Sequence, residues 1–148
     1  MKEKEILIKS PAIPDSKTAV KFAGLAMVAT FLPFFIHLQW LTGPMVNAIL
    51  ILALFLVGIR SAFIIALIPS VVALSSGLLP AVLAPMVPFI MLGNVVLVLS
   101  MDWFSRNSRD STQGYWMGVG MGALLKFALL YYSADIVIGL LLKQQLAT

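Results

Sequence analysis

The chain has 148 residues, of which 61% are hydrophobic and 11% are charged, with a formal net charge of +4. Soluble domains are about 45–50% apolar and roughly 25% charged, so this composition excludes an ordinary soluble protein and predicts an all-α integral membrane helical bundle. The absence of cysteine excludes disulfides and thiolate-held metals, and His37 is the only histidine, so we expect no metal site and no cofactor.

The N-terminal segment, residues 1–17, is mixed in charge and has no short apolar region with a cleavage site, so it is interpreted as a cytoplasmic tail rather than a secretory signal. Residues 18–148 are predicted to form a single membrane-embedded helical domain. Its apolar stretches approach the ~20 residues that a helix needs to cross a bilayer. The predicted spans are residues 18–38, 44–59, 61–74, 81–101 and 114–132.

Short connecting segments and a C-terminal stretch complete the predicted topology. Residues 37–43 and 75–80 are predicted to be short loops, and residues 102–113 the one long polar loop. Residues 136–142 are too short to span a membrane alone. They either extend the fifth helix or begin a sixth helix that the chain does not complete.

The basic residues predict the orientation of the chain. The loops at residues 37–43 and 75–80 contain no Lys or Arg. Because cytoplasmic loops carry an excess of Lys and Arg, the N-terminus is predicted to be cytoplasmic, and the same distribution favours membrane topology over nucleic-acid binding. Near the cytoplasmic ends of the predicted spans lie Lys2, Lys4, Lys9, Lys17, Lys21, Arg60, Arg106 and Arg109.

Among the polar side chains inside the apolar spans, two amides and one ammonium are the most costly to bury: Asn47, Asn94 and Lys126. The asparagines either form hydrogen bonds between helices, worth about 0.6 kcal/mol each, or face a cavity as ligand-binding amides. Lys126 costs roughly 2.5–3.5 kcal/mol to place in the middle of a membrane. It either pairs with carbonyl groups or Asp135, or contacts a polar or anionic substrate group.

Small residues recur on two of the predicted spans. Gly114, Gly118 and Gly122 follow four-residue spacing that lets helices pack closely, and Lys126 continues the same row. In the first span, Ala19, Ala23 and Ala26 form a second small-residue face. That face either packs within this protein or docks against a separate membrane subunit.

Aromatic and polar residues gather near the predicted outer surface. The simplest interpretation of these aromatics is an interfacial belt. Yet apolar walls with a few placed polar groups are also typical of a small-molecule pocket. The residues predicted at this depth are His37, Gln39, Trp40, Asn47, Tyr131 and Tyr132.

No catalytic constellation is recognisable. The lone His37 is predicted in a loop without a nucleophile and an acid beside it, and no Gly-Lys-Ser or Gly-Lys-Thr phosphate-binding loop exists. We therefore expect no enzyme activity. If the protein moves a solute against a gradient, another polypeptide or an ion must supply the energy.

Three segments resemble the substrate-binding S components of energy-coupling factor (ECF) transporters: TGPMVNAILIL (42–52), IPSVVALSSGLLPA (68–81) and APMVPFIMLGN (84–94). The resemblance implies a protein of six helices that binds a vitamin or related micronutrient near the outer face of a prokaryotic cell membrane. It also implies docking, through an Ala-x-x-x-Ala pattern, to a shared transmembrane coupling subunit with two ABC ATPases.

The resemblance assigns roles to individual positions. Ala19 and Ala23 match the docking pattern, and Asn47 and Asn94 match the amides of the binding site. The loop from His37 to Thr42, including Gln39, matches a gate between the first two helices. The sixth helix has no counterpart in this sequence. The rival hypothesis is a structural or assembly membrane protein without a ligand.

Overall fold

The protein is all-helical over the residues that its computed structural model describes, 15–35, 39–77 and 81–146. These ranges contain five α-helices and one short 3-10 helix, and no strand. The elements in chain order are α1 (Ser16–Phe35), α2 (Gln39–Val57), α3 (Ile59–Ser75), η1 (Ala81–Met86), α4 (Val87–Asn107) and α5 (Ser111–Leu146).

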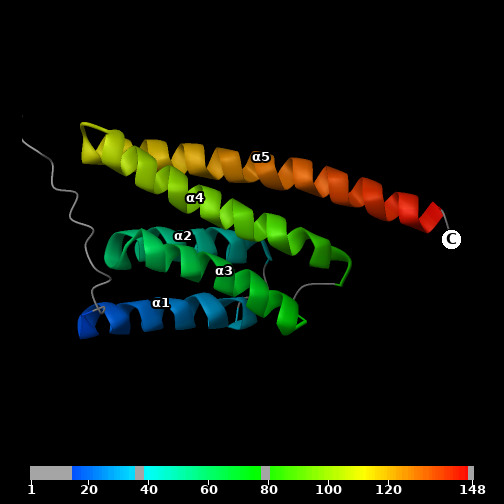
Figure 1. The fold of residues 1–148 in the computed structure, drawn as a ribbon, viewed down its shortest axis with the longest axis horizontal. Coiled ribbons are helices and arrows are strands. Elements are labelled where there is room, and N and C mark those ends of the chain that lie inside the picture. The colour runs from blue at the N-terminus through cyan, green and yellow to red at the C-terminus, as the bar shows by residue number, and fades with distance from the viewer. Residues whose placement is uncertain (1–14, 36–38, 78–80, 147–148) are drawn as a thin grey trace, which may run out of the picture.

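The helices form a bundle that α5 flanks on one side (Figure 1). Helix α1 packs on α2 and α3, α4 packs on α2 and α3, and α5 packs mainly on α4. Apolar side chains from α2, α3 and α4 meet in the centre, where Leu50, Ile65, Leu97 and Met101 are almost fully buried. The best-buried part of the bundle is therefore α2–α4, and α5 is attached to it chiefly through α4.

Gly58 separates α2 from α3 and lets the chain reverse direction. Its φ of 100° and ψ of 168° lie in a region of backbone space that is essentially restricted to glycine. The Gly58 amide donates to the carbonyls of Ala53 and Leu54, which closes the end of α2. The predicted spans 44–59 and 61–74 placed this boundary two residues later, at Arg60.

Two predicted loops are largely helical. Helix α2 begins at Gln39, so residues 39–43 form its first turns, with Pro44 inside the helix. One proline near a helix start removes a single backbone donor, which a helix tolerates. The second of these loops was predicted at residues 102–113, but α4 continues to Asn107. In the last turns of α4, Arg106 donates a hydrogen bond to Asp102 at 2.8 Å.

The loop predicted at residues 102–113 is thereby reduced to the residues between α4 and α5. The side chain of Asp110 accepts a hydrogen bond from the Thr112 amide at 3.0 Å, as a residue preceding a helix often does. The polar residues of this region therefore form helix ends. Polarity did not mark the end of a helix here.

Helix α5 is a single helix of 36 residues, so residues 136–142 extend the fifth helix and do not start a sixth element. At 1.5 Å per residue it is about 54 Å long. A hydrocarbon core is about 30 Å thick, so α5 is longer than one bilayer crossing requires. Figure 1 shows its C-terminal part projecting beyond the other helices.

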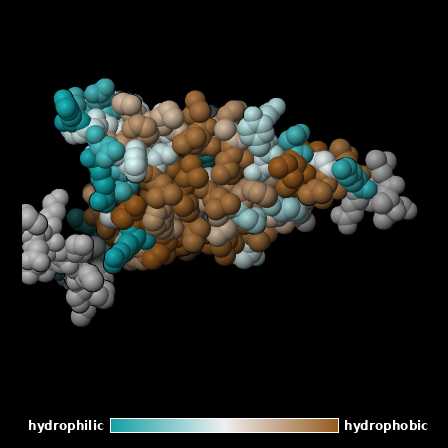
Figure 2. All heavy atoms as spheres, turned by 45° about the horizontal axis from the view of Figure 1, so that its top comes forward, coloured by the Kyte–Doolittle hydropathy of each residue, from teal (hydrophilic) through white to brown (hydrophobic). Residues whose placement is uncertain are grey.

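Two helical segments in the described residues are long and apolar enough to cross a membrane: Leu83–Asn107, with 25 residues, and Ser111–Lys143, with 33. Shorter apolar helices cover Leu41–Val57 and Ile59–Ser75. The face shown in Figure 2 is largely hydrophobic, and hydrophilic residues gather mainly toward one end. That end holds the start of α1, the α2–α3 turn and the α4–α5 turn, which carry Lys17, Lys21, Arg60, Arg106 and Arg109.

Candidate functional site

Lys126 joins three helices at one polar centre. From α5, its Nζ donates to the Asn47 Oδ1 of α2 at 2.5 Å and to the Asn94 Oδ1 of α4 at 2.7 Å. Contacts this short are typical of charge-assisted hydrogen bonds from an ammonium group. The structure thus brings together the three polar residues that the sequence singled out inside the spans.

Asn94 also ties this centre to α3. Its side chain is only 2% exposed, and its Nδ2 donates to the backbone carbonyl of Ala66 at 2.9 Å. Pro69 lies in the next turn of α3 and has no N–H for the Ile65 carbonyl, so the backbone ladder is interrupted beside Ala66. The Asn94 side chain therefore donates from its nitrogen to a carbonyl of α3 and accepts from the Lys126 ammonium with its oxygen.

Glycines make the approach of Lys126 possible. A Cβ on Gly93 of α4 would lie 3.1 Å from Cγ of Lys126, so the lysine stem crosses α4 where no side chain obstructs it. On α5, Gly114, Gly118 and Gly122 are buried against α4, as expected for a small-residue row. Lys126 lies one turn further along this packed face, which directs its side chain into the bundle.

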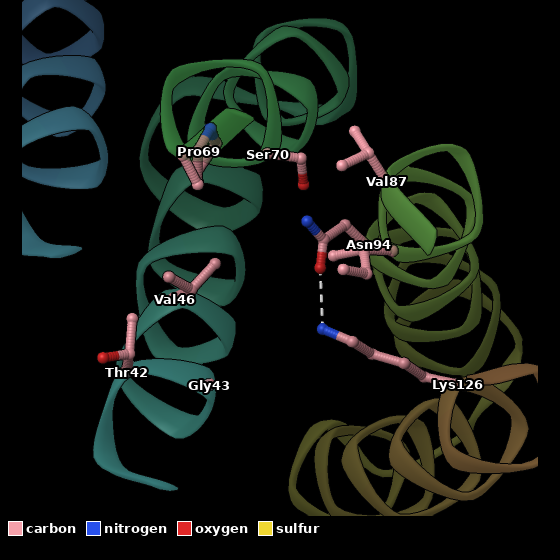
Figure 3. A pocket seen from close by; sticks show the side chains of 10 residues that line it. Thr42, Gly43, Val46, Pro69, Ser70, Val87, Asn94 and Lys126 are labelled. Atoms are coloured by element: carbon pink, nitrogen blue, oxygen red, sulfur yellow. Dashed lines mark hydrogen bonds between the residues drawn. The ribbon is translucent and has the colours of Figure 1, made fainter. Parts of the chain in front are cut away.

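A cavity of about 180 Å³ adjoins this polar centre (Figure 3). Its polar wall includes Asn94, Lys126 and Ser70, whose hydroxyl points toward Asn94. Ser70 is 7% exposed. The other lining residues come from the N-terminal half of α2, the C-terminal part of α3 and the start of α4: Thr42, Gly43, Val46, Pro69, Ala73, Val87 and Ile90.

No carboxylate neutralises Lys126 within the part of the chain that the structure describes. The ion pair there joins Asp102 to Arg106, and Asp135, which the sequence offered as a partner, is exposed on α5. The same residues hold no cluster of three His, Asp or Glu side chains that suits a metal ion. The site is therefore a cationic group bonded to neutral amides beside an apolar cavity.

Tyr131 and Tyr132 do not join the cavity. They are 63% and 67% exposed, and Tyr131 stacks instead on Phe127 of its own helix. With 3.6 residues per turn, Tyr131 lies about 140° around α5 from Lys126. The sequence analysis grouped these residues by their predicted depth in the membrane. Depth does not determine which face of a helix a residue occupies.

The predicted gate falls at the start of α2. Thr42 lines the cavity, which agrees with a position at its entrance. Gln39 and Trp40 belong to the first turn of α2, and their side chains lie outside the described part. His37 lies outside the described residues altogether.

The three alanines of the predicted face on α1 differ in their exposure. Ala19 and Ala23 are exposed, whereas Ala26 is half-buried against the core. Ala26 therefore packs within this protein. Ala19 and Ala23 stay available to a partner, as the docking hypothesis requires.

The sequence analysis did not identify Gly93, Ser70 or Pro69 as site residues. Gly93 precedes Asn94 in the LGN motif, and a glycine in an apolar helix is a signal of close approach. Ser70 follows Pro69 on α3, where a proline marks a helix carbonyl that needs another partner. These signals indicate close contact, but they do not identify the contacting residue.

We expect Asn47→Leu to preserve folding and weaken binding of the native ligand. Asn47 is only half-buried and has one hydrogen bond in the described structure, to Lys126, which keeps Asn94 as a second acceptor. Its loss is expected to cost about 0.6 kcal/mol of stability, the average for such bonds between membrane helices. Thermal unfolding and ligand titration in detergent measure the two effects, and unchanged ligand affinity would contradict a binding role for Asn47.

Comparison with known proteins identifies no relative. No protein-family model matches the chain, no curated protein matches its sequence, and no solved structure matches its fold.

Proposed function

We propose that this chain is the membrane-embedded substrate-binding subunit of an ECF-type ABC importer for a vitamin-like or other small micronutrient. The observation that carries the proposal is the meeting of Lys126, Asn47 and Asn94, from three helices, at one polar centre, of which Lys126 and Asn94 line a cavity. A lysine inside an apolar span is costly, and such residues commonly mark substrate pathways. An apolar pocket with a few convergent polar groups is the usual form of a small-molecule site.

The proposed arrangement is a multi-pass protein of a prokaryotic cell membrane, with five spans and a cytoplasmic N-terminus. The clustering of Lys17, Lys21, Arg60, Arg106 and Arg109 at one end of the bundle supports this orientation. Large apolar side chains on the outside support contact with lipid, among them Phe55, Ile64, Leu92, Leu124 and Phe127. The cavity lies toward the opposite end, near the starts of α2 and α4, and would open outward.

The proposed partners are a transmembrane coupling subunit and two ABC ATPases. The absence of a phosphate-binding Gly-Lys-Ser or Gly-Lys-Thr sequence means that this chain needs another polypeptide for ATP-driven uptake. The exposed Ala19 and Ala23 on α1 offer a face on which another helix can approach closely. These features support a binding subunit that depends on ATP hydrolysis by another polypeptide.

One observation favours a structural or assembly protein without a ligand. Lys126, Asn47 and Asn94 bond to one another, so they can act as links between helices even when the cavity is empty. Under this second hypothesis the cavity is a packing defect, and the polar centre has only a structural role.

Native mass spectrometry on the protein gently purified from its own membranes tests both hypotheses. For the importer we expect a co-purifying small molecule together with a transmembrane subunit and two ATPases. A protein that carries no small molecule and binds only integral membrane proteins without ATPases would support the assembly hypothesis and contradict the importer.

A further inference from the structure

We propose that the cavity accepts a small monocarboxylate whose carboxylate group binds the Lys126 ammonium, an inference that rests on the proposed function of this site as a ligand pocket. Nothing in the resemblance to ECF S components specifies this charge. It follows from the charge, the spare hydrogen-bond donors and the size of the cavity.

In the described structure the positive charge of Lys126 is not balanced by a negative charge. Lys126 bonds to two amide oxygens, which accept hydrogen bonds without supplying a negative charge. None of the described residues that line the cavity is Asp or Glu. A cation held away from water is stabilised when an anion pairs with it, so one ligand carboxylate would make the occupied site neutral. A dianion such as a phosphate ester would leave an excess negative charge, and a cationic ligand would be repelled.

The polar groups of the site have donors to spare. An ammonium has three N–H donors, and Lys126 uses two of them. In the described structure the hydroxyl of Ser70, which lines the cavity, has no hydrogen-bond partner. Donors without acceptors favour a ligand group that only accepts hydrogen bonds, and an ionised carboxylate has two oxygens that do so.

The remaining wall sets the size and polarity of the ligand body. Val46, Ala73, Val87 and Ile90 present an apolar surface to a cavity of about 180 Å³. A protein cavity of about 150 Å³ admits a molecule the size of benzene. A carboxylate attached to one small apolar ring or short chain therefore matches the space, whereas a fused multi-ring compound does not.

Binding of three probes that share a phenyl ring tests the inference on the purified full-length protein in detergent. Benzoate carries one negative charge, benzamide none and phenyl phosphate more than one. Because a hydrogen bond to a charged group is worth roughly 1.5–3 kcal/mol, we expect benzoate to bind about 10- to 100-fold more tightly than benzamide. Phenyl phosphate is expected to bind more weakly than benzoate. Isothermal titration calorimetry measures all three affinities.

Two variants test the role of Lys126 directly. Lys126→Met keeps an apolar side chain of similar length and is expected to remove the preference for benzoate over benzamide. Asn47→Asp places a carboxylate beside Lys126 and is expected to exclude benzoate while the ammonium stays paired. Lys143→Met, the same change at an exposed lysine near the end of α5, is the matched control and should bind like the native protein.

The possible outcomes separate this inference from the proposed function. Benzamide binding as tightly as benzoate, or phenyl phosphate binding more tightly, would overturn the carboxylate and leave a small-molecule site in place. Absence of binding by all three probes would overturn the carboxylate inference, while native mass spectrometry decides the importer independently. The comparison of probes on the native protein decides the question even if the Lys126→Met variant does not fold.

Discussion

Asn94→Leu is expected to lower the stability of the protein more than any other substitution in the cavity wall. Asn94 is 2% exposed and makes hydrogen bonds to both Lys126 and the Ala66 carbonyl. A leucine of similar volume fills the space but leaves the Ala66 carbonyl without the amide and Lys126 with one acceptor fewer. A buried polar group left without its partner costs about 1–3 kcal/mol.

Two considerations set the size of this effect. Hydrogen bonds between membrane helices average only about 0.6 kcal/mol, because polar groups find other partners when the helices separate. That average applies to Asn47, where Lys126 retains a second acceptor. At Asn94 the substitution removes two hydrogen bonds from a side chain that is only 2% exposed, so the larger penalty is expected to apply.

Thermal or denaturant unfolding in detergent measures the effect of Asn94→Leu. Asn107→Leu is the matched control, because Asn107 is exposed at the other end of the same helix. The control is expected to stay within about 0.5 kcal/mol of the native protein, as surface substitutions usually do. Equal stability of the two variants would show that the bonds of Asn94 do not stabilise the fold.

Gly114→Ala is expected to disrupt the packing of α5 on α4. A Cβ at this position would lie 2.8 Å from the backbone carbonyl oxygen of Phe104 and 2.8 Å from Cβ of Ser108. Atoms attached to the backbone cannot rotate away, so the helices must separate locally. Overpacking of a well-packed contact costs typically about 1–3 kcal/mol.

Gly120 provides the control on the same helix. It lies on the exposed face of α5, and a Cβ there meets nothing within 4 Å. Gly120→Ala is expected to leave stability unchanged or raise it, since alanine favours a helix over glycine by up to about 1 kcal/mol. Unfolding curves of the two alanine variants should therefore shift in opposite directions or by clearly different amounts. A Gly114→Ala variant as stable as Gly120→Ala would mean that α5 does not pack on α4 as the structure has it.

The loss of α4–α5 packing has a consequence for the site. Lys126 reaches the cavity only because the glycine row holds α5 against α4. Displacement of α5 moves the Lys126 ammonium away from Asn94 and Asn47. Benzoate affinity measured on the Gly114→Ala variant is therefore expected to fall together with its stability, whereas Gly120→Ala should retain both.

The sequence by itself determined those features that depend on composition and on spacing along one helix. The apolar content predicted a helical protein, and the predicted spans 44–59 and 61–74 placed a helix boundary within two residues of Gly58, where α2 gives way to α3. The spacing of Gly114, Gly118 and Gly122 indicated the packed face of α5. Because Lys126 continues that row, the sequence also indicated that its side chain faces inward.

The tertiary structure alone decided which residues meet across helices. Asn47 and Asn94 both lie in apolar spans, but only the packing of α2, α3 and α4 gives Asn94 two partners and Asn47 one. Tyr131 faces outward, because its position around α5 follows from the face that α4 covers. Periodicity identifies a face along one helix, whereas the partner of that face depends on how the helices pack in three dimensions.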